Sequence, residues 1–277
     1  MSNRPGQVSA SLSRRMGPES FERPRRTSLW WLTNAGFLIN ARGTLVMIDP
    51  IISLDPETPG MSETGMRLLV PLPLEASHVP RLDAVVYTHA DYDHFGRATA
   101  EVLYGTEALF VGPPPVTKEL GEMGLSPYRI RAVSVEETVA VGHVSITPTP
   151  ADHPWQLRDP KRFGRPWGPE DCVGYLIDTP DGRIWCPGDT RLMDEHVQME
   201  GVDVLLLDVG RSEYHLGMEA AIRLANILDP PDIIPYHWGT YDAPDHPAYN
   251  GDPLEVKERL HNPDAFHVLA PGEEFIL

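Results

Sequence analysis

A short segment, Thr88-His89-Ala90-Asp91-Tyr92-Asp93-His94, places four side chains that can bind metal ions within six residues. It follows the apolar run at residues 84–87, which is typical of a buried β-strand. In the extended part of the segment His89 and Asp91 project to the same side, so one cation can accept both. The turn that follows directs Asp93 and His94 to a second position. Imidazole and carboxylate suit Zn(II), Mn(II) or Fe, and we expect a strand that ends in a dinuclear metal site. A polar surface turn is the alternative.

Three more candidate ligands come at the ends of apolar or β-rich runs. They are His153 after residues 144–152, Asp189 after residues 183–188 and His237 after residues 233–236. Candidate ligands that are dispersed along a chain, each at the end of a strand, imply that the fold brings the corresponding loops to one rim.

The order of these motifs carries a family resemblance. The motifs are H-x-D-x-D-H at residues 89–94, T-P-A-D-H at 149–153, P-G-D-T at 187–190, P-Y-H-W-G-T at 235–240, N-A-G-F-L-I at 34–39, M-I-D-P at 47–50 and L-G-M-E-A-A at 216–221. Together they resemble the metallo-β-lactamase superfamily, and within it the branch that contains L-ascorbate phosphate lactonase and N-acyl-phosphatidylethanolamine phospholipase D. The resemblance implies an α/β fold in which two mixed sheets lie between helices in four layers, αββα.

The resemblance also implies two divalent metal ions per chain. His89, Asp91 and His153 would bind one ion, Asp93, His94 and His237 the other, and Asp189 would bridge the two. The superfamily motif usually has a second histidine where Asp91 stands. A carboxylate is a harder, anionic ligand, so we expect the first site to shift toward Mn(II) or Fe(II), and its occupancy stays open.

The leading functional prediction is a metal-dependent hydrolase. A hydroxide held by the two metal ions would cleave a small, anionic ester, lactone or phosphodiester, as in a lactonase or phosphodiesterase. Asp93 could also orient this nucleophile or accept its proton, although metal ligation is its main expected role. A diiron oxygen-handling protein and a noncatalytic metal-binding protein are the alternatives, because one fold hosts many reactions.

Several residues outside the ligand motifs are candidates for the same site. His215 precedes an expected helix and could donate a proton to the leaving group; a surface histidine is the alternative. Asp49 and Asp208 end apolar strands and could hydrogen bond to ligand histidines, or cap loops. The candidate substrate-binding residues are Trp155, Arg162, Trp238 and Tyr241, and Trp167 could also line the pocket. Trp155 and Arg162 lie in a long insertion at residues 155–171, which also carries Arg158, Lys161, Arg165 and Trp167.

Charge and composition limit the partners. The chain of 277 residues has a formal charge of −17, which disfavours nucleic acid, so the expected partner is a small molecule. It has no apolar run long enough to span a membrane and no secretory signal pattern, and its two cysteines fit a reducing, cytoplasmic setting. Residues 1–27 are expected to be a flexible or arm-like segment before a single domain at 28–277, and a homo-oligomer stays open.

Local patterns predict a mixture of strands and helices. Strands are expected near residues 28–33, 35–40, 44–48, 84–88, 106–111, 139–149, 172–178, 183–186, 203–208, 232–236 and 265–269. Helices are expected near residues 97–104, 115–123, 190–198, 217–229 and 253–261.

Overall fold

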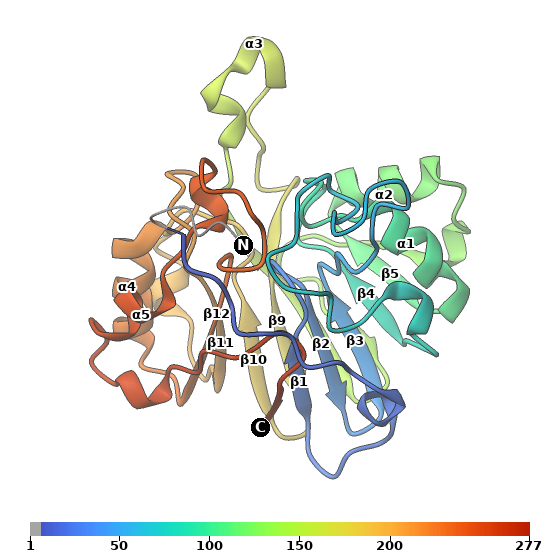
Figure 1. Cartoon of the computed structure of the whole chain (residues 1–277), viewed down its shortest axis with the longest axis horizontal. Helices are drawn as coiled ribbons and strands as arrows, with labels where there is room; N and C mark the ends of the chain where they lie inside the picture. Colours follow the sequence, from blue (N-terminus) through green and yellow to red (C-terminus); the bar gives the residue numbers. More distant parts are fainter. Residues whose placement is uncertain (1–6) are drawn as a thin grey trace.

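The computed structural model describes residues 7–277, which form two β-sheets between two groups of helices (Figure 1). One sheet has the order β13-β1-β2-β3-β4-β5-β6 and the other β12-β11-β10-β9-β8-β7. The strands of the first sheet are β1 (Ser28–Trp31), β2 (Phe37–Ala41), β3 (Thr44–Ile48), β4 (Ala84–Val86), β5 (Leu109–Gly112), β6 (Ile130–Ala132) and β13 (Glu274–Ile276). Those of the second are β7 (Val139–Val141), β8 (Val144–Pro150), β9 (Val173–Thr179), β10 (Gly182–Cys186), β11 (Val204–Asp208) and β12 (Asp232–Tyr236). The predicted fold of two mixed sheets with flanking helices is confirmed.

The helices lie on the outer faces of the two sheets (Figure 1). They are α1 (Arg97–Leu103), α2 (Pro114–Glu122), α4 (Gly217–Leu228) and α5 (Pro253–Lys257), with a short α3 (Pro160–Phe163) that stands apart from both sheets. Helix α4 buries an apolar face that includes Ala221, Leu224 and Ala225. Among the described residues, no helix is both long and apolar enough to cross a membrane.

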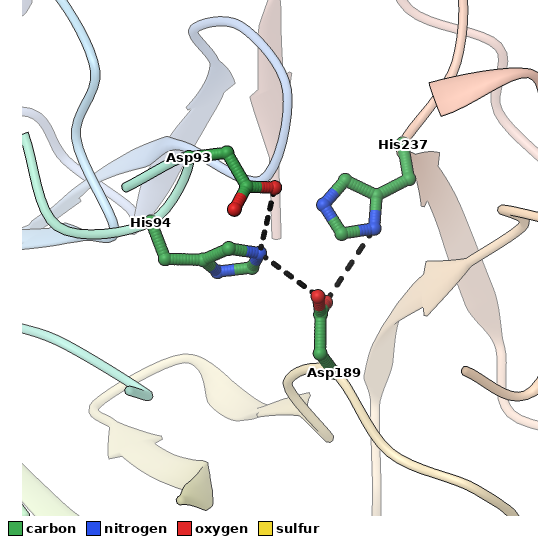
Figure 2. Close-up of side chains that lie close together, drawn as sticks. All are labelled: Asp93, His94, Asp189 and His237. Carbon is green, nitrogen blue, oxygen red and sulfur yellow. Dashed lines mark ion pairs between the residues drawn. The ribbon is translucent and has the colours of Figure 1, made fainter. Parts of the chain in front are cut away.

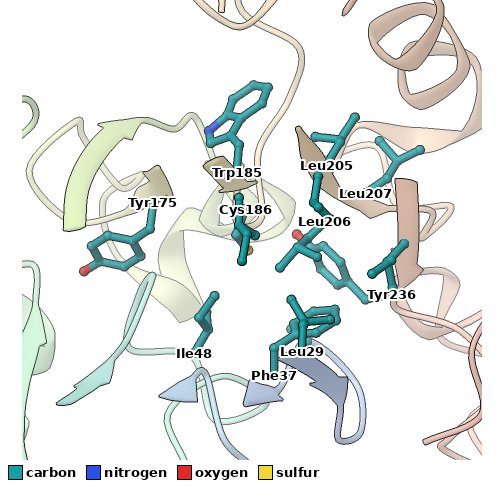
Figure 3. Close-up of a cluster of buried hydrophobic side chains, with 14 of the residues drawn as sticks. Leu29, Phe37, Ile48, Tyr175, Trp185, Cys186, Leu205, Leu206, Leu207 and Tyr236 are labelled. Carbon is teal, nitrogen blue, oxygen red and sulfur yellow. The ribbon is translucent and has the colours of Figure 1, made fainter. Parts of the chain in front are cut away.

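Strands with apolar residues on both faces supply two separate cores. In β3, Val46 and Ile48 face the core between the sheets, whereas Leu45 and Met47 face the core under α1 and α2. The side chains of a strand alternate between its two faces, so a sheet that is covered on both sides needs a continuous apolar run. Figure 3 shows the core between the sheets, where Phe37 of one sheet faces Tyr236 of the other. Their rings meet edge to face with centroids 6.0 Å apart.

The topology brings the candidate ligands to one rim. Strands β3 and β4 are parallel, and so are β10, β11 and β12. Strand β8 runs in the same direction as β10, because both are antiparallel to β9. Loops that follow parallel strands leave a sheet at the same edge. The segments after β4, β8, β10 and β12 therefore deliver the residues that the sequence singled out.

Several predicted elements differ from the structure. Residues 265–269 do not form a strand; only Phe266 makes an isolated bridge to Ile233, and the terminal strand is β13. The predicted helix at 190–198 is a single 3-10 turn at His196–Gln198. Residues 139–149 are a hairpin rather than one run, since Gly142 turns the chain with a φ of +54°.

The segment before β1 lies along the fold as an arm. Within it, the amide of Ala10 donates to the carbonyl of Gly239, and that of Met16 donates to the carbonyl of Pro73. Phe21 is buried among the residues under α1 and α2. The part of the predicted N-terminal segment at residues 1–6 lies outside the described residues.

Candidate metal centre

The first predicted ligand group is assembled around Asp91. Its Oδ2 atom lies 3.5 Å from Nε2 of His89 and 3.3 Å from Nε2 of His153. Tetrahedral zinc with bonds of about 2.0–2.1 Å separates neighbouring ligand atoms by about 3.3 Å. The three side chains are therefore spaced as ligands of one ion would be.

The second group forms where the loops after β4, β10 and β12 meet. Figure 2 shows Asp93 and His94 from the first of these loops facing Asp189 and His237 from the other two. Nε2 of His94 lies 3.7 Å from Oδ2 of Asp93 and 3.1 Å from Oδ2 of Asp189. Nδ1 of His237 lies 3.5 Å from Oδ1 of Asp189. Each of the four side chains offers one ligand atom within 4.8 Å of the others, so the group can also hold one ion.

Asp189 lies between the two groups. Its Oδ2 atom is 3.8 Å from Nε2 of His89 and 3.8 Å from Nε2 of His153, and it also contacts His94 of the second group. Its side chain is buried at the positive-φ turn Gly188, which follows β10. A carboxylate in this position can bind one ion through each oxygen, as a bridging ligand does.

Each of the five histidines in the cluster is held through Nδ1. His94 donates to Asp49 at 2.8 Å, His153 to the carbonyl of Tyr214 at 2.8 Å, His215 to Asp208 at 2.7 Å and His237 to Asp208 at 3.2 Å. His89 donates at 2.8 Å to Thr88 Oγ1, which donates in turn to Asp49 at 2.6 Å. These bonds fix the ring orientation and place the proton on Nδ1, so that Nε2 faces the cluster with its lone pair.

Several atoms of the ligand cluster have no hydrogen-bond partner in the described part of the chain. Among the described residues, Nε2 of His89, His94 and His237 and Oδ1 of Asp189 are buried without a hydrogen-bond partner. Leaving such a group unsatisfied costs about 1–3 kcal/mol. Imidazole lone pairs that converge on carboxylates repel one another unless a cation or proton lies between them. The donor set therefore fits divalent metal ions.

The buried histidines and carboxylates of the cluster shift one another's pKa values. Burial alone would raise the pKa of Asp189, but the positive charges of His215, His237 and His94 hold that pKa well below its usual range. Burial would lower the pKa of His94, yet the charges of Asp189, Asp93 and Asp49 raise it well above its ordinary value. Because metals bind the deprotonated imidazole, loading the site must release protons.

Three residues of the rim adopt left-handed backbone conformations. The φ angles are +63° at His237, +41° at Asp49 and +49° at Asn34. Non-glycine residues rarely adopt this region, and such strain concentrates at functional sites. Asn34 also joins the loops: its side-chain amide donates to the carbonyl of Asp93, and its carbonyl accepts from the amide of His237.

His215, the candidate proton donor, lies in the cluster rather than on the surface. Its side chain is buried, and Nε2 is 3.4 Å from Oδ2 of Asp189. The two carboxylates at strand ends, Asp49 and Asp208, make the predicted hydrogen bonds to histidines. Asp208 additionally accepts the amide of Gly210, so it also caps its loop.

Two of the candidate substrate-binding residues lie in packed surroundings. Trp238 stacks on Trp31 with centroids 5.2 Å apart, and its indole N–H donates to the carbonyl of Pro235. Tyr241 is 1% exposed and meets the ring of Tyr249 edge to face. The structure does not bring either side chain into the ligand cluster.

The other two lie in the protruding lobe, residues 154–171, which includes α3 (Figure 1). Trp155 packs on Phe163 at 4.8 Å, and the guanidinium of Arg162 lies over the same ring. It is instead Trp167 that reaches the cluster, with its ring 5.3 Å from that of His89 and 6.1 Å from that of His153. Gln156, 1% exposed, accepts the amide of Trp167 and holds it there.

Some functional contacts had no signal in the sequence. The hydroxyl of Thr88 and the carbonyl of Tyr214 hold histidines, but neither residue type predicts that role. Tyr249 lies beside His237 with ring centroids 6.1 Å apart and comes from an unpatterned polar loop. Asn34 could have been found, because it opens the N-A-G-F-L-I motif next to a strand.

Two mixed sheets between helices, with histidines and carboxylates converging on one rim, define a protein of the metallo-β-lactamase type. Residues 44–238 match the family model described as the β-lactamase superfamily domain, and the chain belongs to this family. The predicted superfamily is therefore confirmed.

Similar proteins extend over most of the chain. A UPF0173 metal-dependent hydrolase of Pyrobaculum aerophilum is 26% identical over 249 residues, which cover 88% of this chain and 96% of the relative. The isothiocyanate hydrolase from Delia radicum gut bacteria has a TM-score of 0.69 at 20% identity, covering 90% of this chain and 99% of that one. CmlA, a diiron β-hydroxylase from Streptomyces venezuelae, has a TM-score of 0.65 at 17% identity and covers 92% and 55%, respectively.

Proposed function

We propose that this protein is a metal-dependent hydrolase that binds two divalent ions, Zn, Mn or Fe, and cleaves a small ester, lactone or phosphodiester. One observation carries the proposal: buried histidines and carboxylates are grouped closely enough to hold metal ions, and within the described residues three of their Nε2 atoms and Oδ1 of Asp189 have no hydrogen-bond partner. The relatives named metal-dependent hydrolases support the same class. The proposal also includes membership of the branch that contains L-ascorbate phosphate lactonase and N-acyl-phosphatidylethanolamine phospholipase D.

The roles of the residues follow from their contacts. Two ions bound here would supply Lewis acidity that polarises a substrate oxygen and lowers the pKa of water toward neutrality. Asp93, at the edge of the second ligand group, would orient the attacking water. His215 donates Nδ1–H to Asp208 and presents the lone pair of Nε2 to the centre. It can accept a proton from the nucleophile and return it to the leaving oxygen.

The charge around the centre constrains the substrate. Five carboxylates surround it: Asp91, Asp93 and Asp189 belong to the ligand groups, and Asp49 and Asp208 hydrogen bond to Nδ1 of His94 and His215. Two divalent ions supply four positive charges, so the loaded centre with neutral histidines keeps a net negative charge before any hydroxide is counted. A dianionic phosphate monoester would be repelled. We therefore infer a neutral or singly charged substrate.

The expected preference for an anionic substrate depends on cations of the lobe. Arg165 is already paired with Asp171 at 2.5 Å, so it contributes little free charge. Arg158, Lys161 and Arg162 are exposed on the lobe and remain as the groups that would attract an anion. With these cations nearby, the substrate can carry one negative charge at most, as in a singly charged ester or a phosphodiester.

A diiron oxygen-handling function is the second candidate. The observation that favours it is the carboxylate Asp91 at a position next to two histidines, because carboxylate-enriched ligand sets also serve iron and oxygen chemistry. Iron content with an optical band would support it. The complete set of converging ligands opposes a noncatalytic role.

The test combines metal content with a substrate panel. Elemental mass spectrometry on protein purified without added metal is expected to give about two ions per chain. Protein loaded with Zn(II), Mn(II) or Fe(II) is then assayed on a neutral aryl ester, a lactone, an isothiocyanate, a phosphodiester and a phosphate monoester. We expect metal-restored hydrolysis that excludes the monoester. No turnover under any loading would contradict the hydrolase proposal.

A further inference from the structure

We propose that the hydroxyls of Tyr249 and Tyr92 form a hydrogen-bond donor pair beside the metal centre, which binds an uncharged carbonyl-type oxygen of the substrate. The inference deepens the proposed hydrolase function and rests on it for the identity of the reaction. It assigns substrate contact to two residues that lie in none of the ligand sets.

The position of Tyr92 follows from the ligand loop. It lies between Asp91 and Asp93, whose carboxylates turn toward the metal cluster. Its own side chain is 54% exposed, and its hydroxyl lies 3.3 Å from that of Tyr249, whose ring lies beside His237. Tyr92 therefore stands at the edge of the ligand cluster with a side chain that a small molecule can reach.

The ring of Tyr249 is buried and packed against other rings, whereas the ring of Tyr92 is exposed. It is 5% exposed and its ring meets those of His237, Tyr241 and His246 with centroids 6.1, 5.6 and 5.8 Å away. The side-chain amide of Asn250 donates to the carbonyls of three residues of the same loop, which stiffens it. A donor that is held before the substrate arrives needs no reorganisation during the reaction.

Only one of the two hydroxyl protons can lie between the two oxygens, so the other is available to a substrate acceptor. The oxygens are 3.3 Å apart, which is long for a bond between hydroxyls, and Tyr92 is the hydrogen-bond partner of Tyr249 within the described residues. A phenol with an ordinary pKa of about 10 stays neutral at pH 7 and can donate. When the exposed Tyr92 ring turns, both hydroxyls can point at one acceptor.

The charge around the centre selects the acceptor. A neutral phenol stabilises negative charge that develops on a carbonyl oxygen, yet it adds no positive charge that would attract a dianion. A neutral donor pair is therefore compatible with a carboxylate-rich centre, which disfavours dianionic substrates. An ester or lactone carbonyl is therefore the chemistry that the pair fits best.

The test removes each hydroxyl while keeping its ring. In the full-length, metal-loaded protein, Tyr249→Phe is expected to lower kcat on a neutral aryl ester by about 10- to 100-fold, with a smaller change in KM. Tyr92→Phe is expected to have a smaller effect, and the double variant to lose less than the product of the single losses, because the two groups act together. Tyr128→Phe, whose side chain is 95% exposed elsewhere, is the matched control.

A binding measurement separates this inference from the hydrolase proposal. γ-Butyrolactam, which presents an amide carbonyl to the site, is titrated into the metal-loaded variants by calorimetry. Weaker binding by Tyr249→Phe, at unchanged metal content and Tm, supports the donor pair even where no ester is hydrolysed. Absence of lactam binding by the unmodified protein, equal binding by both forms, or loss of metal in Tyr249→Phe would overturn it.

Discussion

The Nδ1–H of His94 donates to Oδ2 of Asp49 at 2.8 Å, and both side chains are buried. The same carboxylate accepts the amide and the hydroxyl of Thr88, which in turn accepts from His89. One carboxylate at the end of β3 thus orients a histidine of each ligand group. Asp49 determines the orientation of ligands without facing the metals itself.

Replacing Asp49 by Asn should weaken metal binding without unfolding the protein. Asparagine tolerates the left-handed φ of +41° at this position and can keep a bond to Thr88. It loses the charge that strengthens the bond to His94, and loss of such partners typically costs about 10- to 100-fold in metal affinity. A competition titration with a chelating dye measures the change. The exposed Asp264→Asn is the control, and an affinity equal to that of the unmodified protein would refute the role of Asp49.

Asp91→His should retain activity and change metal preference. The new imidazole gives the first group the three-histidine character that Zn(II) favours over Mn(II), whereas the carboxylate adds oxygen and charge. Relative affinities for the two ions, measured in parallel for both proteins, test this. Asp91→Asn is the control, because it removes the negative charge without adding an imidazole ligand. If Asp91→His left the preference unchanged, Asp91 would not be a ligand.

Asp189→Ala should abolish hydrolysis and leave the fold intact. The residue contacts histidines of both groups, so its loss is expected to reduce kcat/KM by more than about 100-fold. His237→Ala should behave alike. Circular dichroism and metal content accompany the assay, and Asp194→Ala, an exposed aspartate nearby, is the control. Full activity in Asp189→Ala would exclude the bridging assignment.

Local sequence was sufficient to predict most strands and to single out the polar residues that the fold brings to one rim. The buried strands β3 and β4 are continuous apolar runs, and polar residues that follow such runs end up on the rim. The prediction of a helix at 190–198 was wrong because these residues carry little apolar periodicity; in the structure the loop after Asp189 is irregular up to a turn at residues 194–195 and the 3-10 turn that follows it.

Contacts across the chain could not be predicted in this way. The carbonyl of Tyr214 that holds His153 and the hydroxyl of Tyr92 that meets Tyr249 join segments 61 and 157 residues apart. Neither carries a local pattern. The same limitation applies to Trp238, whose surroundings depend on how distant loops pack.

Trp167 should control substrate shape. Its indole forms a wall over His89 and His153, so Trp167→Ala is expected to raise KM for aryl esters by about tenfold while kcat changes less. Trp167→Phe should recover part of the loss. Leu157→Ala, in the same lobe and 49% exposed, is the control. Equal KM values for Trp167→Ala and the unmodified protein would remove Trp167 from the substrate site.

Asp181 should contribute stability that depends on pH. Its carboxylate, in the turn between β9 and β10, accepts the amide of Thr27 at 2.8 Å and Nε of Arg42 at 2.9 Å, so it joins the two sheets. The hydrogen bond and charge of Arg42 hold the pKa of Asp181 below its usual range, although burial opposes the shift.

A depressed folded-state pKa gives stability that is fully present above the unfolded value of about 3.9 and is lost as the pH falls through the folded value. Asp181→Asn should therefore lower the Tm of the metal-free protein by about 2–4 °C at pH 7. The difference from the unmodified protein should stay constant between about pH 8 and pH 5 and shrink below about pH 4. Asp178→Asn removes an exposed ion pair with Arg183 in the same hairpin, and should change Tm little. A difference in Tm for Asp181→Asn that persists undiminished in acid would show that packing, rather than the ionised carboxylate, joins the sheets there.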